Sequence, residues 1–504
     1  MSMLEKLVRA PDAYAVEDAH RQRSWSSLWD RATRIAHFMI DDLQLAPGDH
    51  VASLQGNNVE FYELVLATMF SGVWLVPVNT HLTAEEVAYI LDDAGAKAVF
   101  ADDSHAALAR ASTTVAIIGI GDELDRHVAG AGDAPFDLDG PTGGRMHYTS
   151  GTTGRPKGVK RALPPTIRGY LDLLSRLGTS MRLDGSGPHL LTGPHYHAAV
   201  SGYALYDLVN GGPIVMMPRF DASSVLRLID ERAIAHTHLV PTMFVRLLRL
   251  PEVTRHAFDP SPMSLVLHGA APISPTTKRA MIDWWGPRLV EYWGTSEGGT
   301  FTMIDSAEWL ARPGSVGRAL SGVEVFAVDD DGRRLGPDEV GTLYCRAGDA
   351  PRPFRYHGAP EKTEASYLAP ATFTMGDMGR VDADGYVFLT DRATNMIISG
   401  GVNIYPAEVE HVLSDHPAVV DVAVFGVPDE EWGESVKAAI ELRAGVAPSD
   451  DLARELIAFA RERLASYKVP RTIDFEERLP RLDTGKILTR QLRDPYWRDR
   501  DRSI

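Results

Sequence analysis

Apolar residues near the start of the chain follow two alternating spacings. Between residues 59 and 70 they recur at helical intervals, and residues 73–78 then form an apolar run typical of a buried strand. Thr83, followed three residues later by Glu86, predicts a capped helix that ends near Gly95. Further strands are predicted at residues 98–100 and 115–120. This alternation of strand and helix predicts a mostly parallel sheet covered by helices.

The alternation resumes in the middle of the chain and then gives way to strands. The Gly-, Asp- and Pro-rich stretch 129–144 is expected to be a surface linker. Helices are predicted at 222–232 and after a cap formed by Ser274 and Pro275, between strands at 213–217, 236–240, 263–267 and 289–292. From about residue 316 short strands alternate with turn clusters, and from residue 395 helices and strands mix again.

These patterns predict an α/β protein with two domains. The large N-terminal domain, residues 1–393, is expected to contain helix-covered, mostly parallel sheets and a β-rich subdomain at about 316–393. The small C-terminal domain, residues 394–504, is expected to be α+β. With 504 residues, 44% hydrophobic and 24% charged, the chain has the composition of a globular protein of several domains.

Composition also limits the partners. The net charge of −17 disfavours nucleic acid or an anionic membrane as the main partner, although a small basic cluster suffices for ATP. The single cysteine, Cys345, excludes an internal disulfide and a cysteine-rich zinc site, and we expect it in the core. No signal peptide is apparent, because residues 1–15 have scattered charges and no apolar run, and no membrane span is expected, because Glu63 interrupts the most apolar segment. A cytoplasmic protein is therefore expected. A homodimer is compatible with these patterns.

Residues Tyr148–Gly158 form the densest cluster of candidate binding groups, with four Ser/Thr hydroxyls, three glycines and one lysine. Because glycine lets backbone approach a ligand closely, the N–H groups and hydroxyls of such a loop can surround phosphate oxygens, with Lys157 as a point charge. Pro156 precedes Lys157, so the stretch is not a Walker A loop, which requires Gly-Lys-Ser/Thr. A linker can have the same composition.

The full stretch resembles the phosphate-binding loop of the adenylate-forming superfamily, which comprises acyl-CoA synthetases, adenylation domains and luciferases. Further matches follow in the family's order as far as the C-terminus, and the chain is most similar to a bacterial fatty-acid or related acid–CoA ligase. The resemblance implies catalytic roles for Thr152 and Lys157. It implies that ATP is bound by Thr149, Ser150, Gly151, Thr152, Thr153, Gly154 and Lys157.

A second stretch, Glu291–Gly298, resembles the family's aromatic-Gly-x-Thr-Glu turn, with Ser296 in place of Thr. The resemblance implies that Trp293 stacks near adenine, that Ser296 contacts phosphate, and that Glu297 is catalytic and helps hold Mg²⁺, which prefers oxygen ligands. An earlier turn resembles the adenine-side wall of the site. These two stretches add Gly269, Ala270, Ala271, Glu291, Tyr292, Gly294 and Thr295 to the expected ATP-binding residues.

Two more matches complete the expected nucleotide site. Asp377, in Met375-Gly376-Asp377, stands where the family's Asp accepts hydrogen bonds from both ribose hydroxyls, and Arg392 is expected to assist it. Lys486, close to the C-terminus, matches the family's catalytic lysine. The resemblance implies that its ammonium meets both the substrate carboxylate and the α-phosphate of ATP.

The region that begins at Asp391 resembles the family's hinge and implies a mobile C-terminal domain. Thr394 stands at the hinge position, where many members carry Asp, Lys or Ser, and Asn395 stands where Asp is common. Gly400 and Gly401 are expected to let the pantetheine arm of coenzyme A pass close to backbone. A glycine turn between a strand and a helix would have the same sequence.

The stretch that contains His195 and His197 matches the family's aromatic segment beside the acyl site. We expect His195, His197, Tyr203 and Met216 to line the acyl pocket. These histidines, and a second pair at positions 236 and 238, also suit a metal site, but no third ligand accompanies either pair. No Asp lies between positions 193 and 203 to bind an amino-acid ammonium, which favours a plain carboxylic acid.

We therefore expect an ATP- and Mg²⁺-dependent acid–CoA ligase. It would activate a fatty or related hydrophobic carboxylic acid as acyl-AMP, release pyrophosphate, and transfer the acyl group to coenzyme A. The individual acid is left open by the sequence. The alternatives are a stand-alone adenylating enzyme that loads a carrier protein, a luciferase-like oxygenase, and a non-catalytic nucleotide-binding protein. Lys157, Glu297 and Lys486 are intact, which disfavours the last.

Overall fold

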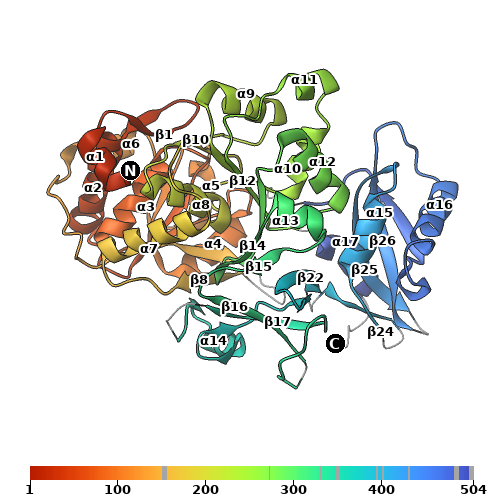
Figure 1. The fold of residues 1–504 in the computed structure, drawn as a ribbon. Helices are drawn as coiled ribbons and strands as arrows, with labels where there is room; N and C mark the ends of the chain where they lie inside the picture. The colour runs from red at the N-terminus through yellow and green to blue at the C-terminus, as the bar shows by residue number, and fades with distance from the viewer. Residues whose placement is uncertain are drawn as a thin grey trace.

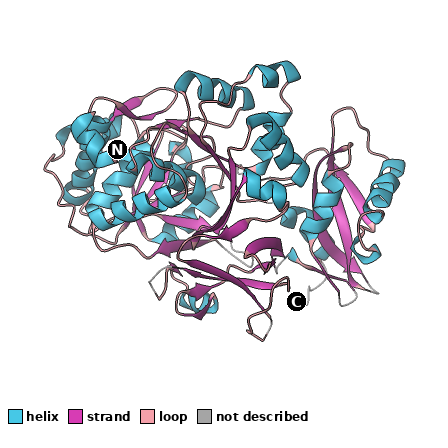
Figure 2. Cartoon of the chain, in the orientation of Figure 1, coloured by secondary structure: helices cyan, strands magenta, loops and turns pink. Residues whose placement is uncertain are grey.

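The computed structural model describes residues 1–149, 156–271, 273–329, 331–347, 351–392, 395–399, 402–429, 432–481 and 487–498. Figure 1 shows a helix-rich N-terminal part at the left and centre, a β-rich part below it, and a C-terminal part at the right. Helices cover the sheets of the first and last parts (Figure 2). The fold class is α/β, as the sequence predicts.

The first sheet is parallel and follows the predicted alternation. Its strands, in the spatial order β4-β3-β5-β6, are β3 (His50–Leu54), β4 (Trp74–Pro77), β5 (Ala96–Ala101) and β6 (Ala116–Gly119). The helices of this region are α3 (Glu60–Ser71), α4 (Ala84–Ala94), α5 (Ala106–Ser112) and α6 (Asp122–Gly130). The predicted capping box of Thr83 and Glu86 opens α4, and Gly95 ends it with a φ of 60°.

The central sheet is parallel over one half. Its parallel strands run in the order β1-β10-β9-β11-β12-β13, with β2 (Gln22–Ser24) antiparallel at the edge. They are β1 (Tyr14–Glu17), β9 (His189–Leu191), β10 (Ile214–Met216), β11 (His236–Leu239), β12 (Leu265–His268) and β13 (Leu289–Thr295). The helices of this half are α1 (Met3–Arg9), α2 (Trp25–His37), α7 (Ile167–Ser180), α8 (Ala198–Val209), α9 (Ala222–Arg232), α10 (Pro241–Leu248), α11 (Glu252–Ala257) and α12 (Pro275–Trp285). Ser274 caps α12 with Pro275 at its start, as predicted.

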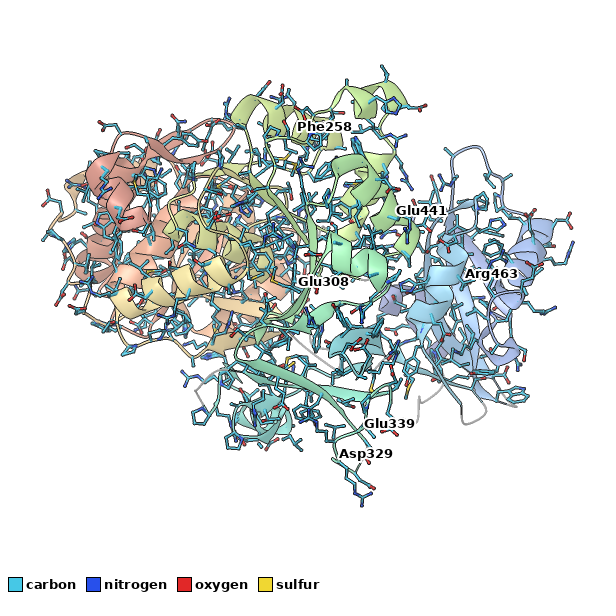
Figure 3. The ribbon with its side chains drawn as sticks, in the orientation of Figure 1. Phe258, Glu308, Asp329, Glu339, Glu441 and Arg463 are labelled. Carbon is cyan, nitrogen blue, oxygen red and sulfur yellow. The ribbon has the colours of Figure 1, made fainter. Side chains whose placement is uncertain are left out.

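The other half of the central sheet is antiparallel and forms the β-rich part. It contains β14 (Gly299–Asp305), β15 (Gly317–Ala319), β16 (Val323–Val328), β17 (Gly341–Ala347), β19 (Tyr367–Ala369), β20 (Thr372–Phe373), β21 (Asp377–Val381) and β22 (Tyr386–Arg392), with α13 (Ser306–Ala311) and α14 (Pro360–Ala365). Glu308 of α13, labelled in Figure 3, accepts hydrogen bonds from the Tyr386 hydroxyl at 3.0 Å and from Arg318 at 2.8 Å. This carboxylate therefore joins α13 to β15 and β22.

The C-terminal part has a separate sheet and a separate core. The sheet contains β23 (Ile397–Ser399), β24 (Val402–Ile404), β25 (Val419–Asp429), β26 (Gly433–Leu442) and β27 (Thr472–Glu476). Its helices are α15 (Pro406–Ser414), α16 (Asp450–Arg461) and α17 (Thr489–Trp497). The Thr276 hydroxyl of α12 donates to Asp415 Oδ1 at 2.6 Å, so the C-terminal part touches α12.

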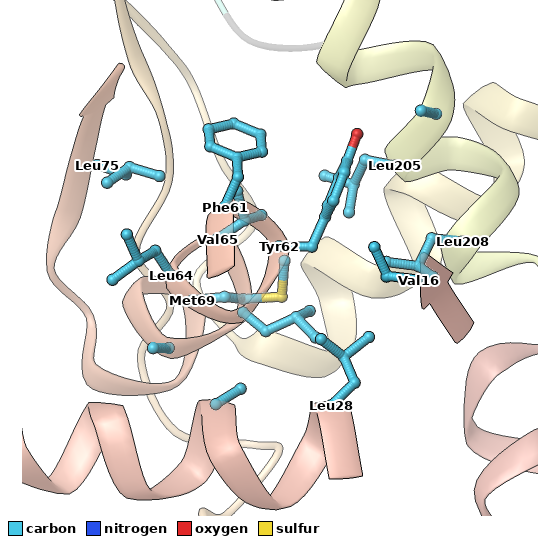
Figure 4. Packing of buried hydrophobic residues seen from close by; sticks show 14 of the residues in the cluster. Val16, Leu28, Phe61, Tyr62, Leu64, Val65, Met69, Leu75, Leu205 and Leu208 are labelled. Atoms are coloured by element: carbon cyan, nitrogen blue, oxygen red, sulfur yellow. The ribbon is translucent and has the colours of Figure 1, made fainter. Parts of the chain in front are cut away.

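Helix α3 is the centre of the largest core and is buried on all sides. Figure 4 shows Phe61, Tyr62 and Val65 of α3 among side chains from α2, β1, β4 and α8. Glu63, also on α3, is fully buried, and its Oε1 accepts from Arg23 at 2.6 Å and from Arg31 at 2.8 Å. The carboxylate that interrupts the apolar segment is therefore neutralised from β2 and α2, as a buried charge requires.

The stretch 129–144 is not wholly the surface linker that its composition predicts. Its last two residues, Gly143 and Gly144, are buried beside β4. The carbonyl of Gly144 accepts from Leu75 N–H at 2.8 Å, and a Cβ on Gly143 would lie 1.8 Å from the Val73 carbonyl oxygen. The glycines serve close backbone packing here, which composition does not distinguish from a flexible linker.

Two further expectations concern burial and the membrane. Cys345 lies in the core of the β-rich part, as predicted, and burial raises the pKa of its thiol well above the ordinary value. Among the residues that the structure describes, none of the helices combines the length and the apolar character that crossing a bilayer requires.

A buried carboxylate attaches α8 to the central sheet. Asp207 of α8 accepts from His189 Nδ1 of β9 at 2.8 Å, from His236 Nδ1 of β11 at 2.9 Å, and from Gly185 N–H at 3.0 Å. Burial raises the pKa of Asp207, but the two histidines outweigh it and hold the pKa below the ordinary value. This network fixes the helix that carries the predicted acyl-pocket residue Tyr203.

We expect Asp207→Asn to lower the free energy of unfolding of the N-terminal part by about 2 kcal/mol, because an amide accepts fewer hydrogen bonds and leaves a buried imidazole N–H unpaired. Denaturant titration at pH 7 measures the change, with exposed Asp172→Asn on α7 as the control. Because the pKa of Asp207 is lowered, its contribution is present at neutral pH and lost as the pH falls below about 4. A difference between parent and variant that persists undiminished at pH 3 would contradict this origin.

Candidate active site

The predicted phosphate loop connects two paired strands, β7 (Met146–Thr149) and β8 (Lys157–Arg161). Thr149 pairs with Lys157 across the antiparallel ladder, so the two ends of the loop lie side by side. On its other edge, β8 pairs with β18 (Phe354–Tyr356) of the β-rich part. The predicted loop residues Ser150, Gly151, Thr152, Thr153 and Gly154 lie outside the described residues, and their contacts with ATP stay predictions.

Glu297 reaches the border of the loop from the turn between β13 and β14. Its Oε1 accepts from the Thr149 hydroxyl at 3.4 Å and from the Tyr356 hydroxyl at 3.1 Å. In the part of the chain that the structure describes, its other oxygen, Oε2, makes no hydrogen bond. A carboxylate oxygen beside a phosphate-binding loop is a suitable ligand for Mg²⁺, so this residue is compatible with the predicted metal role.

Trp293 and Asp377, which the sequence assigns to adenine and ribose, are hydrogen bonded to each other. The indole Nε1–H donates to Asp377 Oδ2 at 2.9 Å, and the indole packs against Phe301 at 5.1 Å between ring centroids. The backbone of Asp377 pairs with that of Arg392, whose side chain is not among those described. Two predicted ligands of one nucleoside therefore lie in contact, although 84 positions separate them in the chain.

The two predicted turns at the adenine side follow neighbouring parallel strands, β12 and β13. A Cβ on Gly269 would lie 2.6 Å from the Tyr292 carbonyl oxygen, and a Cβ on Gly294 would lie 2.3 Å from that of Gly299. Ala270 adopts a left-handed φ of 65°. The same two turns contain Ala271, Thr295 and Ser296. Ligands of parallel sheets bind outside the carboxyl ends of the strands, where these turns lie.

The side chains of Glu291 and Tyr292 have partners within the protein. Glu291 is buried and accepts from Lys278 Nζ at 2.5 Å, and burial raises the pKa of Glu291 and lowers that of Lys278. The Tyr292 hydroxyl lies 3.0 Å from His238 Nε2, on the side of α8. Successive strand residues face opposite ways, so these two side chains belong to different layers.

Three of the four predicted acyl-pocket residues lie on α8 or just before it. His195 is buried, with Nδ1 3.0 Å from Asn57 Oδ1, and burial lowers its pKa to about 3. His197 precedes α8, and burial lowers its pKa to about 4. The Tyr203 hydroxyl lies 3.0 Å from Thr300 Oγ1, so it bridges α8 and β14. Met216 lies in β10 within the main core. Both histidines are therefore neutral near pH 7, and each can donate one hydrogen bond and accept another.

Lys157 contacts two residues that the sequence does not single out. Its Nζ lies 3.4 Å from the Tyr89 hydroxyl and 3.4 Å from Asp93 Oδ1, one turn apart on α4. The hydrogen bond to Tyr89 and the charge of Asp93 raise the pKa of Lys157. The Tyr148 hydroxyl also donates to Asp93, at 2.8 Å. Helix α4 therefore holds Tyr148 and Lys157, which flank the loop, a role that its own amphipathic pattern does not reveal.

The remaining predicted site residues lie outside the described ranges. They are the hinge residue Thr394, the coenzyme A glycines Gly400 and Gly401, and the catalytic Lys486. Among the described residues, no group of three or more His, Cys, Asp or Glu side chains is arranged to hold a metal ion.

Comparison with known proteins identifies the family. A model described as AMP-binding enzyme matches residues 4–349, and a model of the AMP-binding enzyme C-terminal domain matches residues 408–486. These two ranges include the β7–β8 hairpin, the turns after β12 and β13, and the position of Lys486.

Whole-length relatives agree with this assignment. The chain is 34% identical to a fatty acid–[acyl-carrier-protein] ligase, ScoC of Streptomyces coeruleorubidus, over 98% of this chain and 95% of that protein. It is 32% identical to the long-chain-fatty-acid–CoA ligase FadD13 of Mycobacterium tuberculosis, over 96% and 95%. Among solved structures, ATP-bound MatB of Rhodopseudomonas palustris superposes with a TM-score of 0.84 at 29% identity, over 98% and 99% of the two chains.

The matches cover both parts of the chain and the elements that carry the nucleotide-site contacts. The chain therefore belongs to the AMP-binding enzymes of the adenylate-forming superfamily and is an AMP-forming acid–thiol ligase.

Proposed function

We propose that the protein is an ATP-dependent acid–CoA ligase that activates a fatty or related hydrophobic carboxylic acid. The observation that carries the proposal is the contact between Trp293 and Asp377, at 2.9 Å, beside the contact between Thr149 and Glu297, at 3.4 Å. These two hydrogen bonds bring the predicted adenine, ribose, phosphate and metal residues together from separate stretches of the chain.

In the first step the acid's carboxylate oxygen attacks the α-phosphorus of ATP, and the bond from that phosphorus to pyrophosphate breaks. The nucleophile is already an anion at neutral pH, so no general base is required. Catalysis is then the positioning of two anionic groups and the neutralisation of their charge by Lys157 and Lys486. We assign Mg²⁺ to Glu297, and when bound it supplies further positive charge beside the phosphates.

In the second step the sulfur of coenzyme A attacks the acyl carbon, and the bond from that carbon to the oxygen of AMP breaks. We propose that the domain formed by residues 394–504 rotates about Thr394 between the steps, and that Gly400 and Gly401 then border the pantetheine arm. Such a rotation would break the hydrogen bond from Thr276 to Asp415, which ties α12 to the C-terminal part.

A carrier protein is the second candidate acceptor, because ScoC is named for that acceptor. A pyrophosphate-release screen across straight-chain, aryl and alicyclic acids tests the first step. Adding either coenzyme A or a phosphopantetheinylated carrier then tests the second. Thioester formed on the carrier but not on coenzyme A would contradict the proposed acceptor. No pyrophosphate with any acid would contradict ligase activity. A homodimer and a cytoplasmic location stay predictions.

Glu297→Gln is expected to lower adenylation by about 10²-fold at limiting Mg²⁺ and by less at saturating Mg²⁺. The amide keeps an oxygen for Thr149 and Tyr356 but loses the charge that holds the cation. Tyr356→Phe is the matched control, because it removes a hydrogen bond to the carboxylate and keeps the charge. Pyrophosphate release across a Mg²⁺ titration measures the effect, and an unchanged Mg²⁺ dependence would contradict the metal role.

Asp377→Asn is expected to raise the KM for ATP by about 10-fold and to leave the KM for the acid unchanged, because only a carboxylate accepts from both ribose hydroxyls and the Trp293 indole. Trp293→Phe removes the indole donor and keeps an aromatic ring, so it should have a smaller effect. Steady-state kinetics with each substrate varied in turn separate the two constants. Equal rises in both KM values would indicate general damage to the site.

Lys486→Ala is expected to slow acyl-AMP formation by about 10²–10³-fold and to spare thioester formation. Two anions approach each other only in the first step, so one fixed positive charge matters most there. Single-turnover measurements follow each step separately, the second with preformed acyl-AMP and coenzyme A. A similar collapse of both steps would show that the lysine does not serve one step alone.

A further inference from the structure

A cavity of about 80 Å³ lies between the β7–β8 hairpin and helices α7 and α8. Two elements of the proposed active site border it: α8, through Ala198, Gly202 and Tyr206, and the turn after β13, through Ser296. Leucines of α7 form an apolar wall, and the hairpin contributes polar groups. The polar residues that matter here are Arg145, His147 and Arg161.

The two arginines converge from neighbouring strands. Arg145 directly precedes β7, and Arg161 ends β8 opposite it, one position beyond the pair Met146–Lys160. The Arg145 Nη1 donates to Ser201 Oγ of α8 at 3.1 Å. The Arg161 Nη2 lies 2.8 Å from where a Cβ on Gly299 would be, so its guanidinium faces the turn after β13. Both positive charges therefore lie on the cavity side of the hairpin.

The described residues supply no carboxylate to either arginine. In the described part of the chain no carboxylate lies within ion-pair distance of Arg145 or Arg161, and residues 150–155 contain no Asp or Glu. His147, between the arginines and the loop, has a buried Nε2 without a hydrogen-bond partner. Burial, with the charge of Arg145 next, lowers the pKa of His147 well below the ordinary value, so this ring is neutral.

Several buried charges elsewhere are paired within the protein, although among the described residues buried Lys160 meets only the ring of Trp74. Glu63 is paired with Arg23 and Arg31, and Lys278 is paired with Glu291. Two half-buried guanidiniums beside an apolar wall are strengthened in their attraction for an anion, because less water screens them. Guanidinium groups bind carboxylates through two parallel hydrogen bonds, which suits a carboxylate between two arginines.

The reacting carboxylate does not account for this site. It has to meet the α-phosphate at the loop, next to Thr149, whereas Arg145 lies four residues earlier along the same strand direction. At about 3.3 Å per residue, this places the Arg145 backbone roughly 13 Å from the loop. Arg161 lies equally far from Lys157 on the other strand. An anion at the arginines is therefore distinct from the reacting carboxylate.

We propose that the substrate is a dicarboxylic acid, an inference that rests on the proposed ligase activity. The apolar middle of this acid lies against α7, and its distal carboxylate lies between Arg145 and Arg161. This site makes the second carboxylate a determinant of specificity, because a monocarboxylic acid of the same length leaves both guanidiniums unpaired.

The test compares matched acids, such as hexanoate with hexanedioate, across a series of chain lengths, by kcat/KM for pyrophosphate release. The parent is expected to prefer the best diacid over its monoacid on the order of 100-fold. Arg161→Met should remove this preference by lowering kcat/KM for the diacid only, and Arg161→Lys should retain part of it. Arg355→Met is the control, because Arg355 pairs with β8 at Lys160 but is exposed and outside the cavity.

Unchanged turnover of the monoacid by Arg161→Met shows that the variant is folded and that Arg161 does not serve the phosphates. Equal loss with both acids, or no preference in the parent at any chain length, would overturn the proposal while leaving ligase activity intact. If neither series of acids releases pyrophosphate, the proposed function fails, and the diacid site is then tested by binding of the acids alone. The diacid, but not the monoacid, should then raise the melting temperature of the parent and not that of Arg161→Met, and equal shifts would overturn it.

Discussion

The pairing of Thr149 with Lys157 across β7 and β8 is the constraint on which the site depends. It closes the phosphate loop, and because strand side chains alternate, it also decides which residues face α7 and α8. Arg145 and His147 share the face of Thr149, whereas Lys160 on the other face lies 4.6 Å over the ring of Trp74. A slip of one residue would exchange these faces and separate the loop from Glu297. One short hairpin therefore orients both the nucleotide end and the acid end of the site.

Features with local causes could be predicted from the sequence. The capping box of Thr83 and Glu86 and the Ser274-Pro275 start of α12 depend on residues within one helical turn, so the sequence contains their full cause. The contact of Trp293 with Asp377 has no local cause, and only resemblance to a family placed both residues at one nucleoside. The buried glycines at 143 and 144 show the opposite case, in which composition predicts a linker and long-range packing decides otherwise.

The residues that sequence reasoning missed act through partners far away in the chain. Tyr356 reaches Glu297 only because β18 pairs with β8, and Asp93 reaches Lys157 only because α4 packs beside the hairpin. Arg161 follows the recognised loop by a few residues, yet its position opposite Arg145 depends on strand register. Arg145 and Arg161 belong to no sequence pattern with a chemical signature, so their role becomes apparent only when the strands are paired.

The distribution of buried charge separates scaffold from site. In the scaffold, Glu63 is paired with two arginines and Asp207 accepts from two histidines, so each buried carboxylate joins separate elements through ordered contacts. At the cavity the described residues place two arginines without a carboxylate partner and a histidine nitrogen without a hydrogen bond. The excess positive charge is best explained as half of an interaction whose other half is supplied by the substrate.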